Sequence, residues 1–319
     1  MMEFVFAALG LVILLLAGDA LVRGAVNMSL RLGVPALIVS LTIVSFGTSA
    51  PELLIAISAI EDNAPGLALG NVVGSNTANI LLVLGMPALI AGLHTGECDT
   101  RKSYVTMLAA SVLFIVICFM GPITWVDGLI LLAALTLVLS SQAMAALNHR
   151  KAGDEEEEEL EGVDPSMPWW KIGVFLILGL IGLPLGADML VDASVEIARD
   201  FGVSETVIGL TLVAIGTSLP ELATTVMAAI RNQADVALGN VIGSNMFNLL
   251  GIIGVAALFG KIPVERQFLE FDLWVMLGAS LIIAPFVFSD TLSMTKRWGI
   301  LLVAAYGAYL WIVVHPGMT

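Results

Sequence analysis

The sequence predicts an all-α polytopic membrane protein with ten transmembrane helices in two inverted five-helix repeats. Three observations support this fold class. The 319 residues have a mean hydropathy of +0.99 and 13% charged residues, against roughly 25% in soluble domains. Ten stretches of the chain are apolar over the length that a bilayer-spanning helix needs, about 20 residues. One motif-rich segment occurs twice at a constant spacing.

The ten apolar stretches are the expected transmembrane helices. They cover residues 3–22, 34–60, 66–92, 104–120, 124–147, 169–191, 203–230, 236–259, 272–289 and 298–315. The first stretch lacks a basic region before it and a convincing small-residue cleavage site after it. We therefore expect a retained helix there and not a signal peptide.

Lysine and arginine indicate the orientation of these helices, because cytoplasmic loops are enriched in both. If both termini lie outside, ten basic residues fall on the cytoplasmic side and three fall outside. The cytoplasmic set is Arg23, Arg31, Arg101, Lys102, Arg150, Lys151, Lys171, Arg231, Lys296 and Arg297, and the outer set is Arg199, Lys261 and Arg266. We expect an integral protein of the plasma (cell inner) membrane with both termini outside.

The composition argues against several kinds of partner and cofactor. The chain has 27 acidic and 13 basic residues, a net charge of −14, whereas binding of nucleic acid requires clustered cations. Two cysteines, Cys98 and Cys118, cannot build a disulfide framework or a thiolate metal site. The three histidines lie near the ends of apolar stretches. We therefore expect no nucleic acid, no cofactor and no obligate protein partner, with the lipid bilayer as the surroundings.

Residues 148–168 form a linker between a predicted N-terminal repeat, 1–147, and a predicted C-terminal repeat, 169–319. Eight of the eleven residues from Asp154 to Asp164 are acidic. Like charges repel and do not pack, so we expect a solvated cytoplasmic tether. The alternative is a weak calcium-binding or regulatory strip.

The two repeats are related by an offset of 169 residues. Residues 41–85 align without a gap on residues 210–254, and 22 of the 45 positions are identical. GTSAPEL (47–53) returns as GTSLPEL (216–222), and ALGNVVGSNTAN (68–79) returns as ALGNVIGSNMFN (237–248). Each half holds five helices, an odd number, so the second half must enter the membrane from the opposite side. Transporters with such inverted repeats bind ions at the repeat interface near the bilayer midplane.

Each copy of the first motif places a glutamate, Glu52 or Glu221, inside an apolar stretch. A charged side chain there costs at least about 2.5 kcal/mol, so it needs a partner, a proton or a function. The preceding proline, Pro51 or Pro220, has no N–H and frees a backbone carbonyl one turn earlier. A purely structural glutamate, protonated or hydrogen-bonded, is the alternative.

Further oxygen donors recur around these glutamates. They are Thr48, Ser49, Asn71, Ser75 and Asn79 in the first repeat, and Thr217, Ser218, Asn240, Ser244 and Asn248 in the second. The glycines among them are expected to serve helix packing, and Asn76 and Asn245 are expected to bond neighbouring helices. Hard oxygen donors suit Ca²⁺, which takes about 6–8 oxygens, and Na⁺ by the same argument, and they disfavour zinc, copper and iron.

GTSAPE and GNVVGSNTAN, with their inverted copies, resemble the α-repeats of the sodium/calcium exchangers, within the calcium:cation antiporter superfamily. The resemblance implies a core of the second, third, seventh and eighth helices around a cluster of cation sites. It also implies that the first and sixth helices are long, tilted and able to slide against this core.

The resemblance also implies roles for individual residues. Glu52 and Glu221 would bind Ca²⁺ together with the carbonyls of Thr48 and Thr217. The sodium sites would be formed by Ser49, Ser75, Ser218 and Ser244 and by the backbone oxygens of Ser45 and Ala214. Asn79 and Asn248 would line the middle, where many family members have one Asp; this chain has Asn at both positions, which leaves ion identity and stoichiometry open.

The sequence therefore predicts a secondary antiporter, not an enzyme, that exchanges Na⁺ for Ca²⁺ by alternating access, with Na⁺ influx driving Ca²⁺ extrusion. A proton-coupled Ca²⁺/cation exchanger is an alternative, because two membrane glutamates can also carry H⁺. A passive cation channel is a further alternative. An intramembrane enzyme would need a nucleophile–base pair or a catalytic metal, and the repeated acids read instead as ion ligands.

Overall fold

The computed structural model describes residues 2–93, 100–152, 164, 166–202, 214–289 and 291–314. Within these ranges the secondary structure is helical, apart from isolated bridges between Leu93 and Met294 and between Ile123 and Ile262. Eight helical stretches in these ranges are long and apolar enough to cross a membrane, and one pair bent by 42° makes up to nine. The predicted all-α, membrane-spanning class is confirmed.

Each half begins with a long helix, and the two motif-bearing segments follow it in the same order in both halves. The first half contains α1 (Met2–Leu32), α2 (Ala36–Val39), η1 (Ser40–Val44), α3 (Ser45–Thr48), α4 (Ala50–Glu61), α5 (Pro65–Ala78), η2 (Asn79–Val83), α6 (Gly85–Ile90), α7 (Arg101–Met120) and α8 (Trp125–Ala152). The second contains α9 (Trp169–Asp200), α11 (Ala214–Gly216), α12 (Leu219–Ile230), α13 (Ala234–Met246), η4 (Phe247–Ile252), α14 (Ile253–Phe259), η5 (Phe268–Asp272), α15 (Leu273–Ile282), α16 (Ala284–Phe288) and α17 (Lys296–Val314). Of the predicted span 203–230, residues 203–213 lie outside the described residues, and the rest forms α11 and α12.

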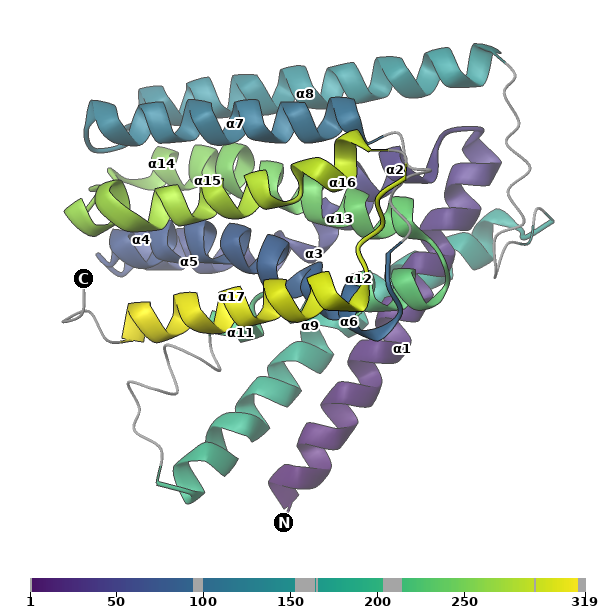
Figure 1. Ribbon diagram of the computed structural model, residues 1–319, viewed down its shortest axis with the longest axis horizontal. Coiled ribbons are helices and arrows are strands. Elements are labelled where there is room, and N and C mark those ends of the chain that lie inside the picture. The colour runs from purple at the N-terminus through teal and green to yellow at the C-terminus, as the bar shows by residue number, and fades with distance from the viewer. Residues whose placement is uncertain are drawn as a thin grey trace.

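Helices α1 and α9 pack along each other and cross the remaining long helices obliquely (Figure 1). Both are longer than predicted, because the expected ends at residues 22 and 191 were set by the charged residues that follow. Charged side chains at the end of a span can reach the aqueous layer, so the helix continues past them. A Cβ atom on Gly186 would lie 2.8 Å from the backbone nitrogen of Leu14. Glycine therefore allows these two backbones to approach closely.

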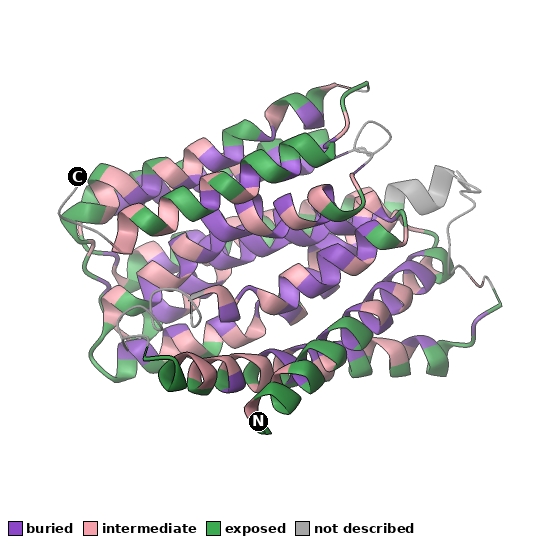
Figure 2. Ribbon diagram, turned by 60° about the horizontal axis from the view of Figure 1, so that its bottom comes forward, coloured by how far each residue is buried: buried purple, intermediate pink, exposed green. Residues whose placement is uncertain are grey.

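The centre of the bundle is formed by the two segments that carry the second motif. The most apolar windows of Pro65–Ile90 and Ala234–Phe259 are 78% and 83% buried, against 11% for Trp125–Leu147 and 17% for Lys296–Val314. Figure 2 shows the buried residues concentrated in the middle of the bundle. These two segments, the third and eighth of the predicted helices, thus lie inside, and the other helices cover them.

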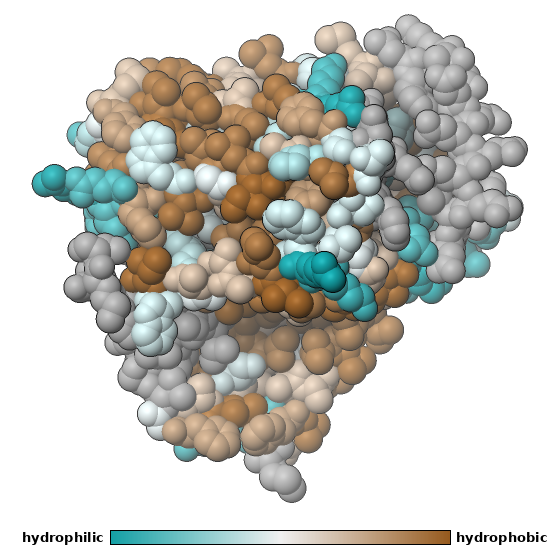
Figure 3. Space-filling model, in the orientation of Figure 1, coloured by the Kyte–Doolittle hydropathy of each residue, from teal (hydrophilic) through white to brown (hydrophobic). Residues whose placement is uncertain are grey.

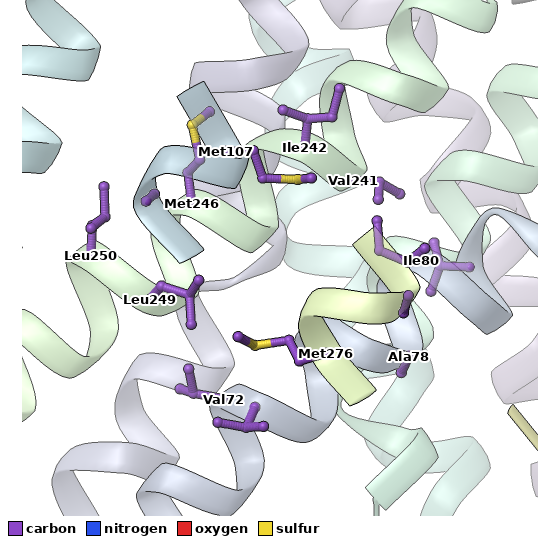
Figure 4. Packing of buried hydrophobic residues seen from close by; sticks show 14 of the residues in the cluster. Val72, Ala78, Ile80, Met107, Val241, Ile242, Met246, Leu249, Leu250 and Met276 are labelled. Atoms are coloured by element: carbon purple, nitrogen blue, oxygen red, sulfur yellow. The ribbon is translucent and has the colours of Figure 1, made fainter. Parts of the chain in front are cut away.

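Apolar side chains from both repeats fill this centre (Figure 4). Val72 and Ile80 come from the first repeat, Val241 and Leu249 come from the second, and all four are completely buried. The outer surface is also largely apolar, as the brown side chains in Figure 3 show. Apolar residues on both sides of a helix are expected where the surrounding solvent is lipid.

The glycines of the second motif in the second repeat allow α13 to pack directly on α2 and η1, whereas a Cβ atom on Gly74 would meet nothing within 4 Å. A Cβ atom on Gly243 would lie 2.6 Å from the carbonyl oxygen of Leu41, and one on Gly239 would lie 3.0 Å from that of Leu37. The prediction that these glycines serve helix packing is confirmed for this pair.

The helices that follow the first motif end in the same way in both repeats. Asn63 has φ 58° and Asn232 has φ 56°, a left-handed conformation that Asn tolerates and that terminates helices. The next N–H groups, of Ala64 and Gln233, bond carbonyls five residues back at 2.8 Å. The internal repeat of the sequence is therefore also a repeat of local structure.

Candidate functional site

Both copies of the first motif interrupt a helix at a serine. Ser49 lies between α3 and α4 with φ −87° and ψ 4°, and Ser218 lies before α12 with φ −91° and ψ 3°. Pro51 has no N–H to donate to the carbonyl of Gly47, so the regular helix cannot continue through this turn. In the first repeat the two helical pieces, Ala36–Thr48 and Ala50–Glu61, are bent by 42° at this break.

Each glutamate lies in the first turn of the helix that follows the break. There the positive end of the helix dipole favours a carboxylate. Glu52 and Glu221 are each 1% exposed. Ser49 Oγ, three residues before Glu52, donates to Glu221 Oε1 at 3.3 Å. The two halves of the chain therefore bring their glutamates to one site.

Two further hydrogen bonds join the halves and are related by the repeat. Thr48 Oγ1 donates to Asn240 Oδ1 at 3.4 Å, and Thr217 Oγ1 donates to Asn71 Oδ1 at 3.4 Å. Asn240 Nδ2 also faces the carbonyl of Glu221 at 3.4 Å. The amide of Asn240 thus links the two halves and holds the backbone next to a glutamate.

Several buried polar atoms at this site have no hydrogen-bond partner among the described residues. They are Oε2 of Glu52 and Glu221, Oγ of Ser218 and Ser244, Oδ1 of Asn79, and both amide atoms of Asn248. A buried polar group without a partner costs about 1–3 kcal/mol. Because these atoms are mostly oxygens, a cation is the ligand that would satisfy them.

The serine and the last asparagine of each second motif lie at or just beyond the C-terminal ends of α5 and α13. Ser75 and Ser244 are 4% and 0% exposed, and Asn79 and Asn248 are each 1% exposed. The π-helical turns η2 and η4 begin at Asn79 and one residue before Asn248. Such wide turns are common at functional sites, and here they occur at the same place in both repeats.

Asn76 and Asn245 bond each other across the repeats. Asn76 Nδ2 donates to the carbonyl of Asn245 at 3.1 Å, and Asn245 Nδ2 donates to the carbonyl of Asn76 at 3.4 Å. The prediction that these two residues join neighbouring helices is confirmed.

The remaining predicted backbone ligands differ in their surroundings. The carbonyl of Ser45 already accepts from the N–H of Ser49 at 3.0 Å and from Thr48 Oγ1 at 3.3 Å. Ala214 is the first residue of α11. The acidic run of the linker, residues 154–163, lies outside the described residues.

An ion-pair cluster at the far end of α12 from Glu221 was not anticipated. Asp19 in α1 pairs with Arg23 at 3.0 Å and with Arg231, which follows α12. The repeat equivalent of Arg231 is Asp62, so the repeat does not indicate this contact. The available signal was Asp19 itself, because an acid inside an apolar span requires a cation.

The donor set favours a hard cation. Within the described residues no group of three or more His, Cys, Asp and Glu side chains could hold a metal ion. The site instead combines two carboxylates with hydroxyl, amide and carbonyl oxygens. This chemistry fits Ca²⁺ and Na⁺ better than transition metals.

Comparison with known proteins agrees with this chemistry. The profile of the sodium/calcium exchanger protein family matches residues 2–144 and 171–315. The chain belongs to the sodium/calcium exchanger family. Each matched segment of this exchanger-family chain contains one copy of the two motifs.

This chain is similar to individual members of the family over most of its length. It is 33% identical to the sodium/calcium exchanger MaX1 of Methanosarcina acetivorans, over 98% of this chain and 99% of that protein. It is 25% identical to a Ca²⁺/H⁺ antiporter of Aphanothece halophytica, over 82% of this chain and 78% of that protein. A structure of the sodium-calcium exchanger NCX_Mj, soaked with 2.5 mM Na⁺ and 1 mM Sr²⁺, superposes with a TM-score of 0.80 at 31% identity, over 99% of this chain and 98% of that one.

Proposed function

We propose that this protein exchanges Na⁺ for Ca²⁺ by alternating access, with Na⁺ influx driving Ca²⁺ extrusion. Membership of the exchanger family supports coupled ion transport. The observation that carries the proposal is the meeting of Glu52 and Glu221, contributed by different halves of the chain and buried among oxygens without partners. Two carboxylates balance the charge of one Ca²⁺ or of two Na⁺.

The proposed ligand set has two parts. Glu52 and Glu221 bind Ca²⁺ with the carbonyls of Thr48 and Thr217. The flanking sodium sites use Ser49, Ser218, Ser75 and Ser244 with the backbone oxygens of Ser45 and Ala214, while Asn79 and Asn248 line the middle. Because both ions use the same carboxylates, Ca²⁺ and a full set of Na⁺ exclude each other, and this competition couples their movements.

The proposed architecture is ten transmembrane helices in two inverted five-helix repeats, residues 1–147 and 169–319, joined by the linker 148–168. The exchange of hydrogen bonds between Asn76 and Asn245 supports it, because two-fold related residues contact each other reciprocally. The matching bonds of Thr48 and Thr217 add support. We place both termini outside the cell, in accord with the distribution of basic residues.

The two repeat-related sides of the site differ in exposure. Thr48 and Asn240 are 2% and 0% exposed, whereas Thr217 and Asn71 are partly exposed. We infer that ions reach this conformation from the side of Asn71, which is the outer side in the proposed orientation. In the opposite conformation the two pairs would exchange their exposure.

A proton-coupled exchanger is the second candidate. It is favoured by the neutral Asn79 and Asn248, which leave the site two carboxylates, and by similarity to a Ca²⁺/H⁺ antiporter. A channel is a less favoured third candidate.

Ion-gradient experiments in proteoliposomes distinguish these functions. Vesicles loaded with Na⁺ and diluted into Na⁺-free buffer should accumulate ⁴⁵Ca²⁺, and a protonophore should not abolish the uptake. Uptake that requires a pH gradient and ignores Na⁺ would establish the proton-coupled function. Ca²⁺ flux without a counterion requirement would indicate a channel.

A further inference from the structure

The amides of Asn79 and Asn248 occupy equivalent positions in the two repeats, but only one of them is held by a hydrogen bond. Asn79 Nδ2 donates to Asn245 Oδ1 at 3.0 Å. The equivalent bond would join Asn248 Nδ2 to Asn76 Oδ1. Both of these atoms are buried and lack a partner among the described residues.

The orientation of Asn245 follows from its own contacts. Its Nδ2 faces two acceptors, the carbonyl of Asn76 at 3.4 Å and the sulfur of Met107 at 3.8 Å. Its Oδ1 therefore points the other way, towards Asn79. Only the NH₂ end of the Asn79 amide can bond this oxygen, because two acceptors repel each other.

Fixing the NH₂ end of Asn79 also fixes its oxygen. Asn79 Oδ1 is buried and has no partner in the part of the chain that the structure describes. An amide oxygen held in this way is a ready cation ligand, since it need not be oriented again when the ion arrives. The amide of Asn248 has no such restraint and can present either end.

We propose that Asn245 is a positioning residue that orients Asn79 as an oxygen ligand for the transported cation, so that the two middle asparagines are not equivalent. This inference rests on the proposed function, because it concerns the same ion site. All four residues, Asn76, Asn79, Asn245 and Asn248, are asparagines, so the repeats do not differ in sequence here. They differ in their hydrogen bonds: Asn79 bonds Asn245, whereas Asn248 does not bond Asn76.

The matched substitutions Asn245→Leu and Asn76→Leu test this role. Each removes one of the two reciprocal bonds between the repeats, but only Asn245→Leu frees Asn79. Loss of residues that orient metal ligands typically lowers affinity by about 10–100-fold. We expect Asn245→Leu to raise the apparent KM for Ca²⁺ about tenfold, with a smaller change in kcat, and Asn76→Leu to change KM less than about twofold.

A double-mutant cycle with Asn79→Ala tests whether Asn245 acts through Asn79. In the Asn79→Ala background, Asn245→Leu should raise KM no further, because the oriented oxygen is already gone. Equal effects of the two leucine variants, or additive effects in the cycle, would overturn the proposal.

Two further measurements keep the test independent of folding defects and of transport. If Asn245→Leu does not fold, Asn79→Asp and Asn248→Asp replace it. Asp at 79 places an oxygen against Asn245 Oδ1, so Ca²⁺ exchange should fall about tenfold more than with Asp at 248, and equal losses would contradict the proposal. The Ca²⁺-induced rise in Tm of the purified variants reports binding, so it tests Asn245 even if the wild type shows no Na⁺ coupling.

Discussion

Ser49 and Ser218 occupy the same place in the two repeats, yet only Ser49 bonds a glutamate. Its hydroxyl donates to Glu221 at 3.3 Å, while Ser218 Oγ lacks a partner among the described residues. A hydrogen bond to a carboxylate both stabilises the charge and fixes the oxygen that carries it. The candidate residues of the site could be predicted from the repeat, but this asymmetry could not, because both copies of the motif have the same amino acids at these positions.

This difference gives a prediction for the serines. Ser49→Ala and Ser218→Ala should both weaken activation by Na⁺, because both hydroxyls are proposed sodium ligands. Ser49→Ala should also raise the apparent KM for Ca²⁺ by about tenfold or more, because a hydrogen bond to a charged group contributes about 1.5–3 kcal/mol. Initial rates of ⁴⁵Ca²⁺ uptake over a range of both ions measure these effects, and identical ion dependence of the two variants would contradict the asymmetry.

At the scale of elements, α1 and α9 form a closely packed pair, and α1 also packs on α12. A Cβ atom on Gly18 of α1 would lie 3.0 Å from the carbonyl oxygen of Ala223 in α12. A larger residue at this contact would push the pair away from the core. The resemblance to the exchangers implies that α1 and α9 slide against the core, and such movement requires that no side chain project into this contact.

We therefore expect Gly18→Val to lower the rate of exchange by about tenfold or more, because bulk in a close-packed helix contact costs about 1–3 kcal/mol. Gly173→Val is the matched control, since a Cβ atom on Gly173 of α9 would meet nothing within 4 Å. The two variants are compared by transport rate per folded protein. Equal rates would show that the contact does not limit movement.

The ion pair between Asp19 and Arg231 joins α1 to the end of α12. Their side chains are 20% and 16% exposed, so removal of the arginine leaves a largely buried acid with Arg23 as its remaining ion-pair partner within the described residues. Arg231→Met should lower the free energy of unfolding by about 1–3 kcal/mol, and Arg231→Lys by less. Thermal unfolding in detergent measures the loss; an unchanged Tm for the methionine variant would show that the pair does not hold α1.

The sequence predicted which elements exist better than where they end. Apolar length identified the long helices, but it stopped α1 at Arg23, although the helix continues to Leu32. The helix ends because of the backbone conformation that follows it: Gly33 has φ 65°, and the N–H of Val34 bonds the carbonyl of Ser29 at 3.0 Å. A glycine in this conformation ends a helix whatever the hydropathy before it.

For the whole molecule, the end of the linker is anchored to α1. The N–H of Asp164 donates to Asn27 Oδ1 at 2.9 Å, and Arg31 Nε donates to the carbonyl of Met167 at 3.0 Å. Hydrogen bonds from Ser166 and the nearby Lys171 and Arg31 hold the pKa of Asp164 below its usual value. The described contacts of this anchor are made by Asp164 and Met167.

Deletion of residues 154–162 should therefore leave the exchange rate and the apparent Ca²⁺ affinity nearly unchanged. The expectation follows because a solvated tether carries no contacts that the fold requires. Ca²⁺-activation curves of the deletion variant and the full chain test it. A large shift in activation by Ca²⁺ would show that the acidic run is regulatory.

The repeat predicts which residues pair across the two halves, but it does not predict how exposed each pair is. The pairs Thr48–Asn240 and Thr217–Asn71 have equal hydrogen-bond distances but different exposure. Both copies of the motifs have the same residue types at these positions, so the sequence does not indicate which pair is the more exposed.

The central claim is that Glu52 and Glu221 together bind the transported Ca²⁺. Na⁺-dependent ⁴⁵Ca²⁺ uptake by Glu52→Gln and Glu221→Gln tests it most directly, with Glu61→Gln, an exposed glutamate of the same helix as Glu52, as the control. Removing one of two charges that balance Ca²⁺ should abolish uptake in either site variant, while Glu61→Gln retains it. Uptake near the wild-type rate in either Glu52→Gln or Glu221→Gln would contradict the paired-carboxylate site.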